Sequence, residues 1–318
     1  MNGSVWSAQT LDGCPHSSAV AAIELGGTKL LCRVVLADGT LLTEERFATS
    51  TPDAAMNDIE ACVETALGAE GRLRAVGVAS FGPIVVDPMA EDYGRILETP
   101  KSDWSGFDLF TALRERLHAP ILVDTDVNAA VLAEHRLGSG RGFSSIAYVT
   151  VGTGIGGALS ANGNILRGAL HPEIGHLRIG REKDDLYPGC CPFHDDCVEG
   201  LASGRAIAGR LGEGFSLDKM PETRDLVVRY LGRLSAMLVL TWAPARIVFG
   251  GGVMKGNALL SDMNNAMRDV LSGYGPSAAR EEDYLTMACL EDAGLEGAHL
   301  MVAGYEEEKK LCNFRNGE

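Results

Sequence analysis

The sequence predicts an α/β protein built from two similar halves. The first half opens at Ala19 with an apolar strand, a glycine turn and a second β-branched run, "AVAAIELGGTKLLCRVVLADGT". The second half opens at Ser145 with the same pattern, "SIAYVTVGTGIGGALSANGNIL". Segments with a helical period alternate with short apolar strands after each opening, and this alternation is typical of α/β architecture.

The elements of the first half follow in order. A third strand comes after the "ADGT" turn, and a helix begins near Asp53 and ends near Gly68, because acidic residues favour the first turn and glycine favours the stop. Then come the buried strand "RAVGVAS", an irregular stretch from Met89 to Phe107, the helix "DLFTALRERLH", the strand "PILVDTD" and the helix "VNAAVLAEHRLG".

The second half is mostly helical after Gly200. We expect helices at "LASGRAIAGRLG" and "ETRDLVVRYLGRLSAMLVLTW", then the short strand "RIVFGGGVM". A final helix, "GLEGAHLMVAGYEEE", is expected to pack back on the first half.

A duplicated α/β unit that opens with a β-hairpin is typical of the actin-like ATPase (ribonuclease H-like) fold, in which two domains face each other across a cleft. We expect residues 1–18 to form a flexible extension. Residues 19–135, with a C-terminal helix at about 295–318, are expected to form a smaller α/β domain. Residues 136–294 are expected to form a larger α/β domain that includes a cysteine-rich loop.

Composition excludes several classes of protein. Hydrophobic residues make up 46% of the 318 residues and charged residues 22%, as in ordinary globular proteins. The formal charge of −15 repels nucleic acid and anionic membranes, so neither is expected as a partner. The N-terminus lacks the basic and apolar regions of a signal peptide, and no apolar run is long enough to span a membrane. We therefore expect a cytoplasmic protein, in which clustered cysteines favour metal binding over disulfides.

Two glycine turns are candidates for phosphate binding. In "IELGGTK", Gly26 and Gly27 let the backbone present N–H groups to an anion, while Thr28 and Lys29 add a hydroxyl and a charge. A strand follows instead of a helix, so this is no Walker loop. Alone it is more often an ordinary turn, but the "VGTGIGG" turn at Gly152 repeats it, and two such turns could clamp one polyphosphate.

The segment "DTDVNAA" is a candidate for general-base chemistry. Asp124 and Asp126 lie where a predicted strand ends and a helix begins, which is where α/β sheets place ligands. The helix dipole favours an ionised carboxylate at Asp126. A helix N-cap is the alternative interpretation, but a carboxylate opposite two phosphate-binding turns suits a base. The triple glycine of "FGGGVM" would admit a nucleoside, a weak signal on its own.

A cysteine- and histidine-rich segment has the spacing of a metal site. Cys191, His194 and Cys197 form a C-x₂-H-x₂-C pattern, and His176 completes a Cys₂His₂ set. Four such ligands leave no open position, which suits a structural, tetrahedral zinc ion. Cys190 is an alternative ligand to Cys191.

The sequence "HPEIGHLRI" places a carboxylate, Glu173, three residues before the imidazole of His176. This combination suits neighbouring sugar hydroxyls, because it offers both donors and acceptors; an ordinary surface pair is the alternative. One ring nitrogen of His176 can bind a metal while the other donates a hydrogen bond.

Taken together, these segments resemble the ROK family of sugar kinases and repressors. The shared pattern, in order, is "GGTK", "GPI", "D-V-N-A", "GTGIGGA", "E-x-G-H", a metal cluster followed by "E-G-x-A-S-G", and "GGG". The form "CCPFHDDCVEG", with a histidine among the ligands, is similar to the zinc-containing fructokinase branch, as are "ASFGPIVVDP" and "TPKSDW".

The resemblance implies a role for each matching residue. Asp126 would remove the proton from the attacking sugar hydroxyl. The sugar pocket would be lined by Gly82, Pro83, Asn128, Glu173, His176 and Glu199. The residues facing ATP would be Gly26, Gly27, Thr28, Lys29, Thr153, Gly154, Gly250, Gly251 and Gly252. The structural zinc would be held by His176, Cys191, His194 and Cys197.

The implied reaction is the phosphorylation of D-fructose to fructose 6-phosphate by ATP with Mg²⁺, in a homodimer. The alternatives are a kinase for glucose, mannose or an N-acetylated amino sugar, a sugar-sensing repressor, and a zinc-stabilised binding module. Eighteen residues before the first strand are too few for the repressors' helix-turn-helix. Arg205 stands where the family pattern has a proline, so it either adds a phosphate contact or points to solvent.

Overall fold

The computed structural model describes residues 18–68, 71–212, 217–255 and 259–316. The chain separates into two compact units: unit 1 contains residues 1–130 and 292–318, and unit 2 contains residues 131–291. The predicted N-terminal extension, residues 1–18, lies outside the described residues except for Ser18.

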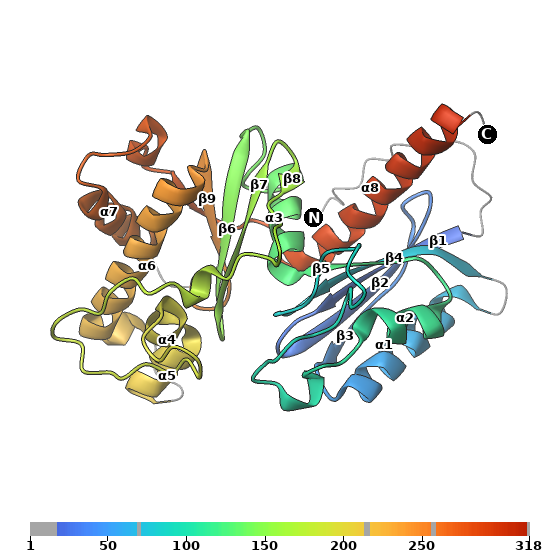
Figure 1. The fold of residues 1–318 in the computed structure, drawn as a ribbon, viewed down its shortest axis with the longest axis horizontal. Coiled ribbons are helices and arrows are strands. Elements are labelled where there is room, and N and C mark those ends of the chain that lie inside the picture. Colours follow the sequence, from blue (N-terminus) through green and yellow to red (C-terminus); the bar gives the residue numbers. More distant parts are fainter. Residues whose placement is uncertain (1–17, 69–70, 213–216, 256–258, 317–318) are drawn as a thin grey trace. The chain divides into compact units, whose positions relative to one another are not determined.

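Unit 1 contains a five-stranded sheet in the order β3-β2-β1-β4-β5 (Figure 1). Strands β1, β2 and β3 form an antiparallel meander, while β4 and β5 run parallel to β1. The strands are β1 (Ser18–Leu25), β2 (Lys29–Leu36), β3 (Leu41–Ala48), β4 (Arg72–Ser80) and β5 (Ile121–Thr125). The helices are α1 (Pro52–Leu67), the 3₁₀ turn η1 (Ser102–Trp104), α2 (Leu109–Leu117) and α8 (Ala293–Asn316). Helix α3 (Asp126–Arg136) begins in unit 1 and ends in unit 2.

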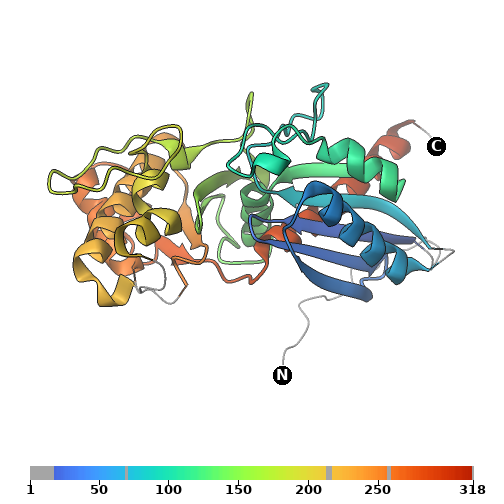
Figure 2. The same cartoon turned by 90° about the horizontal axis from the view of Figure 1, so that it is seen from below.

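Helices cover both faces of this sheet, as Figures 1 and 2 show. In β1, Ala21 and Ile23 face the core that contains α1 and α2. The intervening Ala22 faces the other way and packs against Leu295 and Ala298 of α8. Because side chains alternate across a strand, this two-residue period buries β1 on both faces.

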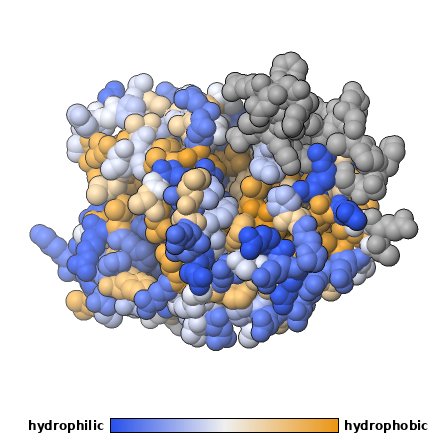
Figure 3. Space-filling model, turned by 45° about the vertical axis from the view of Figure 1, so that its right-hand side comes forward, coloured by the Kyte–Doolittle hydropathy of each residue, from blue (hydrophilic) through white to orange (hydrophobic). Residues whose placement is uncertain are grey.

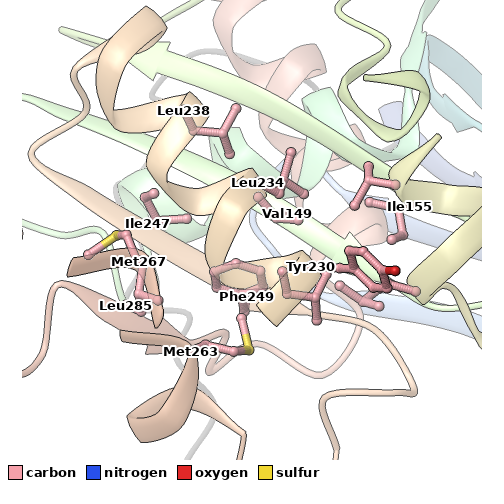
Figure 4. Close-up of a cluster of buried hydrophobic side chains, with 14 of the residues drawn as sticks. Val149, Ile155, Tyr230, Leu234, Leu238, Ile247, Phe249, Met263, Met267 and Leu285 are labelled. Carbon is pink, nitrogen blue, oxygen red and sulfur yellow. The ribbon is translucent and has the colours of Figure 1, made fainter. Parts of the chain in front are cut away.

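Unit 2 contains a second five-stranded sheet, in the order β10-β9-β6-β7-β8. Its strands are β6 (Ser145–Val151), β7 (Ile155–Ala161), β8 (Asn164–Ile165), β9 (Arg246–Gly250) and β10 (Leu285–Met287). Its α-helices are α4 (Val198–Ala202), α5 (Gly204–Leu211), α6 (Pro221–Trp242) and α7 (Leu260–Leu271). Its 3₁₀ turns are η2 (Ile174–His176), η3 (Leu217–Lys219) and η4 (Ser277–Arg280). Figure 4 shows α6 and α7 packing apolar side chains such as Leu234 and Met263 against Val149 and Phe249 of the sheet.

The two sheets have the same topology, which confirms the predicted duplication. In each unit the first strand is central, the next two form a meander on one side, and two later strands are parallel to the first on the other side. The strands β1 to β5 therefore correspond to β6 to β10 in order.

Several elements differ from the sequence prediction, among them strand β8 and helix α7, which it does not specify. The predicted helix "LASGRAIAGRLG" is interrupted at Ser203, where the backbone is extended. The Ser203 side chain caps α5 by accepting a hydrogen bond from the Ala206 N–H. Strand β10 was not predicted, because three residues are too few to show a period.

The described surface mixes polar and apolar residues, and Figure 3 shows hydrophilic and hydrophobic patches interspersed on one face. Among the described residues, none of the helices combines the length and the apolar character needed to cross a bilayer.

Candidate functional site

Several predicted site residues of unit 1 lie at one edge of its sheet. The register pairs Leu25 with Ser80 and Ser80 with Thr125, so β1, β4 and β5 end level with one another. The next residues along the chain are the first glycine turn, the cis-linked Gly82–Pro83 pair and Asp126. The carboxyl ends of parallel strands are where α/β sheets bind ligands.

The first glycine turn joins β1 to β2. Its closing bond runs from the Gly26 N–H to the Lys29 carbonyl at 2.9 Å. Gly27 and Thr28 are exposed at the tip. Lys29 is not a free charge, because its Nζ lies 2.6 Å from Oδ1 of Asp292 and 3.4 Å from Oε1 of Glu24.

These contacts tie the turn to the start of α8. Burial lowers the pKa of Lys29, but the hydrogen bond from Lys29 to Asp292 and the charge of Glu24 outweigh it, so the pKa is raised overall. Glu24 in turn accepts from the Leu295 N–H at 3.1 Å, in the first turn of α8. Within unit 1, Lys29 thus anchors the turn as well as offering a cation.

Asp126 is the first residue of α3 but is not the residue whose side chain caps it. The Thr125 hydroxyl accepts from the Asn128 N–H at 3.1 Å and fills that role. Oδ1 of Asp126 accepts from the adjacent Val127 N–H at 2.8 Å. The N-cap alternative for Asp126 is therefore wrong, and its half-buried carboxylate lies at the positive end of the helix dipole.

Asn128 is fully buried beside Asp126. Its Nδ2 donates to Oδ1 of Asp124 at 2.6 Å, and the same oxygen accepts from the Thr125 N–H at 2.8 Å. Oδ1 of Asn128 makes no hydrogen bond with the described residues. A buried amide oxygen without a partner is costly, so this acceptor suits a hydroxyl donor from a ligand. Asp124 therefore fixes the orientation of this amide, a role that the sequence pattern did not indicate.

The second glycine turn joins β6 to β7 in unit 2. The Gly152 N–H donates to the Gly154 carbonyl at 2.9 Å. Helix α5 presses directly on the turn, since the Gly204 N–H donates to the Gly152 carbonyl at 2.7 Å and a Cβ on Gly204 would lie 2.7 Å from that oxygen. The Arg205 N–H points to the Thr153 carbonyl at 3.4 Å, a contact that a proline would not make.

The triple glycine that begins with the last residue of β9 lies beside this second turn. The register pairs Gly250 with Thr150, close to the end of β6. Gly251 has a φ of +92°, and a Cβ there would lie 2.4 Å from the Val151 carbonyl. Gly252 is exposed with nothing within 4 Å of its Cβ position. Packing therefore requires glycine at 251, while the surface at 252 is open to a ligand.

The four predicted metal ligands come together in unit 2. Their ligating atoms all lie within 4.8 Å of one another. Nδ1 of His176 is 3.6 Å from Sγ of Cys191, 3.6 Å from Sγ of Cys197 and 3.3 Å from Nδ1 of His194. A tetrahedral zinc with Zn–N of about 2.1 Å and Zn–S of about 2.3 Å separates its ligand atoms by about 3.4–3.7 Å. The donor set and its spacing fit zinc, and the group contains Cys191 and not Cys190.

Backbone geometry shapes the short turn that carries two of these ligands. Cys191 and Asp195 pair across it, with the Asp195 N–H donating to the Cys191 carbonyl at 3.1 Å. Gly189 and Gly200 both pack against the Asp195 carbonyl oxygen. A Cβ would lie 2.0 Å from that oxygen at position 189 and 1.9 Å from it at position 200. Gly175 likewise has no room for a Cβ, which would meet the Ile155 carbonyl at 1.9 Å. The glycine of "E-x-G-H" is thus a packing requirement that the sequence pattern alone did not explain.

Two carboxylates flank the metal cluster. Burial, with a smaller contribution from the charge of Glu199, raises the pKa of Glu173 to about 7. Oε1 of Glu173 lies 3.4 Å from Nδ1 of the buried His171. Oε2 of Glu199 accepts from the Ile155 N–H at 2.9 Å and lies beside Gly154, so Glu199 connects the metal segment to the second glycine turn.

The predicted site residues thus form separate groups within each unit. Unit 1 holds the first glycine turn, Gly82, Pro83, Asp126 and Asn128, and unit 2 holds the second turn, the triple glycine, the metal cluster and the two glutamates. Within unit 1, a carboxylate at a strand end, a buried acceptor with no partner among the described residues and an exposed glycine turn are suited to phosphoryl transfer onto a hydroxyl.

Comparison with known proteins agrees with this chemistry. The model of the ROK family matches residues 20–304. The fructokinase of Zymomonas mobilis is 35% identical over 291 residues, covering 90% of this chain and 97% of that protein. The fructokinase of Lactococcus lactis is 34% identical over 277 residues, covering 86% and 92%.

A solved structure supports the same assignment. The ROK family glucokinase of Streptomyces griseus, in complex with glucose and AMPPNP, matches with a TM-score of 0.67 and 25% identity, covering 88% of this chain and 97% of that one. The match confirms the predicted actin-like ATPase fold. The chain therefore belongs to the ROK family, as a relative of its sugar kinases.

Proposed function

We propose that this protein is an ATP-dependent hexose kinase whose substrate is D-fructose and whose product is fructose 6-phosphate. The observation that carries the proposal is the edge of unit 1. There Asp126 and Asn128 follow the end of β5, level with the first glycine turn, and Oδ1 of Asn128 has no hydrogen-bond partner in the described part of the chain. This edge offers a base, an acceptor for a sugar hydroxyl and exposed backbone for phosphate.

In the proposed reaction, Asp126 accepts the proton of the attacking hydroxyl as that oxygen bonds to the γ-phosphorus of ATP and ADP leaves. Mg²⁺ bound with ATP neutralises charge on the phosphates. The exposed backbone of the glycine turns and of Gly252 receives the nucleotide, and Glu173, His176 and Glu199 bind sugar hydroxyls. Positioning and electrostatics supply most of the rate in such transfers, because the protein does little covalent chemistry.

Zinc has a separate, structural role in this proposal. The four residues would supply all four ligands of a tetrahedral zinc ion and would leave no coordination position for substrate. Both histidines offer Nδ1 to the cluster, so the Nε2 of His176 remains available for a hydrogen bond. The zinc would thus fix the backbone that carries Glu173 and His176.

Two observations favour fructose over other hexoses as the proposed substrate. The Cys-His-Cys spacing resembles the fructokinase branch, and the relatives that match most of the chain at 34–35% identity are named fructokinases. The glucokinase structure makes glucose the second candidate. Mannose and N-acetylated amino sugars follow from the family resemblance.

A coupled assay of ADP formation across fructose, glucose, mannose and N-acetylmannosamine tests the proposal. We expect the highest kcat/KM for fructose, with phosphate on O6 by NMR of the product. A higher kcat/KM for another hexose would overturn the substrate, and hexose-independent ATP turnover would overturn the kinase. Cytoplasmic location and a homodimer belong to the same proposal, and light scattering of the purified protein tests the dimer.

A further inference from the structure

The segment between η2 and α4, residues 177–197, is long and irregular, yet it carries three of the four metal ligands. Stretches of this length without regular structure are uncommon inside compact domains. Their backbone groups need partners outside the usual ladders. Besides bonds within its own turns, the segment is held by side chains of unit 2, several of them charged.

Asp185 is the centre of these contacts. Its side chain is almost fully buried and accepts two hydrogen bonds from Arg210, at 2.6 Å and 2.7 Å. It also accepts from the Tyr230 hydroxyl at 2.6 Å and from the Tyr187 N–H at 3.0 Å. Burial alone would raise the pKa of this carboxyl, but the bonds from Arg210 and Tyr230 lower it to about 2. Asp185 is therefore ionised and fully partnered.

The partners of Asp185 connect both ends of the metal loop to the helical core. Arg210 lies on α5, and its guanidinium also donates to the Leu201 carbonyl of α4 at 3.2 Å. Helix α4 begins immediately after the ligand Cys197, which is its N-cap. Arg210 stacks on Tyr187 at 4.4 Å from the ring centroid, three residues before Cys190. Tyr230 lies on α6, with its ring in the core of Figure 4 and its hydroxyl on Asp185.

Two more arginines hold the upstream part of the segment. Arg233 of α6 donates to the Gly180 carbonyl at 2.7 Å and pairs with Glu182. Arg181 donates to the carbonyls of Tyr187 and Pro188. None of these contacts uses a metal ligand, so the segment is held in place by interactions that are independent of the ion.

We propose that Asp185, Arg210 and Tyr230 act as a metal-independent clamp that preorganises the three zinc ligands of residues 177–197, and that the bound zinc in turn positions His176 and the nearby Glu173. They are positioning residues that touch neither zinc nor sugar. A preformed ligand set loses less conformational entropy when the ion binds, so the clamp raises zinc affinity. The proposed effect of the clamp on zinc affinity depends only on the metal cluster. The proposed effect of the clamp on sugar binding rests on the proposed function.

The test compares zinc affinity in Asp185→Asn, Tyr230→Phe and wild type, by competition with a chromophoric chelator on folded protein. Direct hydrogen-bond partners of metal ligands contribute about 10–100-fold in affinity. Asp185 contacts no ligand and acts through the segment, so for Asp185→Asn we expect a loss near the lower end of that range, about tenfold. Tyr230→Phe keeps the ring and removes one bond, so its loss should be smaller. Should Asp185→Asn fail to fold, Tyr230→Phe still decides.

The matched control is Leu238→Ala, which removes buried side-chain volume from α6 away from the segment. It should lower the melting temperature without changing the zinc affinity of the folded protein. Wild-type affinity in both clamp variants, or an equal loss in Leu238→Ala, would overturn the clamp. A higher KM for fructose in the clamp variants would support the clamp if excess zinc returns it to the wild-type value and the KM for ATP is unchanged.

Zinc affinity is measured without substrate, which separates the two proposals. A wild-type protein that binds zinc but phosphorylates no hexose would overturn the kinase proposal and not the clamp. A wild-type protein without zinc affinity would overturn the clamp whatever its activity.

Discussion

The two units repeat one sheet topology but hold their functional residues in opposite ways. In unit 1, Asp126 and Asn128 lie on the first turn of a helix directly after β5. Neighbouring Thr125 and Asp124 hold Asn128 with short local bonds, and Asp126 accepts from the adjacent Val127 N–H. In unit 2, the metal ligands lie on a long irregular segment whose position depends on side chains from α5 and α6.

This difference separates chemistry from architecture. A residue at a strand end is placed by the sheet itself, so its position changes little when a distant side chain is removed. A residue on a long loop is placed by whatever holds the loop, here a buried ion pair and the proposed zinc. Substitutions at the site residues of unit 1 should therefore lower turnover and leave stability unchanged. Substitutions in the metal segment of unit 2 should lower zinc binding and stability, and affect turnover only through them.

The largest expected effect is chemical and lies in unit 1. Asp126→Asn keeps the size of the side chain but removes the base, so turnover should fall by about 10²–10⁴-fold. Steady-state kinetics with fructose and ATP measures this. Zinc content and thermal melting should match wild type, because the capping bond belongs to Thr125. A variant that keeps more than a few per cent of wild-type turnover would show that Asp126 is not the base.

The next effect is structural and lies in unit 2. Cys191→Ala should abolish stoichiometric zinc, because a Cys₂His₂ set reduced to three ligands loses its tetrahedron. The free energy of unfolding should fall by several kcal/mol, since structural zinc binding is worth about 10–16 kcal/mol in small zinc peptides and contributes directly to folding. Metal analysis and thermal melting measure the two quantities.

Cys190→Ala is the control for this change. Cys190 lies outside the ligand group, so its variant should retain one zinc per chain. Loss of zinc from Cys190→Ala, with zinc retained in Cys191→Ala, would reverse the assignment of the ligand.

The same contrast explains what could be predicted from the sequence. Glycine turns, strand ends and the C-x₂-H-x₂-C spacing are local patterns, and the duplicated topology and the grouping of four ligands follow from them. Asp185, Arg210 and Tyr230 are far apart in sequence and form no motif, so only the fold reveals their contact. The choice of Thr125 as the capping residue depends on which of two adjacent polar side chains turns toward the helix, and composition does not determine it. The break at Ser203 depends on the extended backbone of a serine that could also have continued the helix.

Removal of the sugar acceptor in unit 1 should have an intermediate effect. Asn128→Ala removes an Oδ1 that makes no hydrogen bond with the described residues and is proposed to accept from fructose. A net hydrogen bond contributes about 0.5–1.5 kcal/mol, so the KM for fructose should rise by about 2–13-fold. Kinetics with each substrate varied in turn measures this, and the KM for ATP is the internal control. An equal rise in both KM values would point to a general distortion of unit 1 instead.

The smallest expected effect is on stability. It comes from comparing one substitution near each of the two glycine turns by its effect on the free energy of unfolding. Gly204→Ala would place a Cβ 2.7 Å from the Gly152 carbonyl, a backbone atom that cannot move aside without disturbing the second turn. We expect a loss of about 1–3 kcal/mol in the free energy of unfolding, the usual range for overpacking. Gly27→Ala, at the exposed tip of the first turn, meets nothing within 4 Å and should change that free energy by no more than about 0.5 kcal/mol. Urea unfolding followed by circular dichroism measures both variants. Equal losses would mean that α5 does not brace the second turn and that the two turns are held alike.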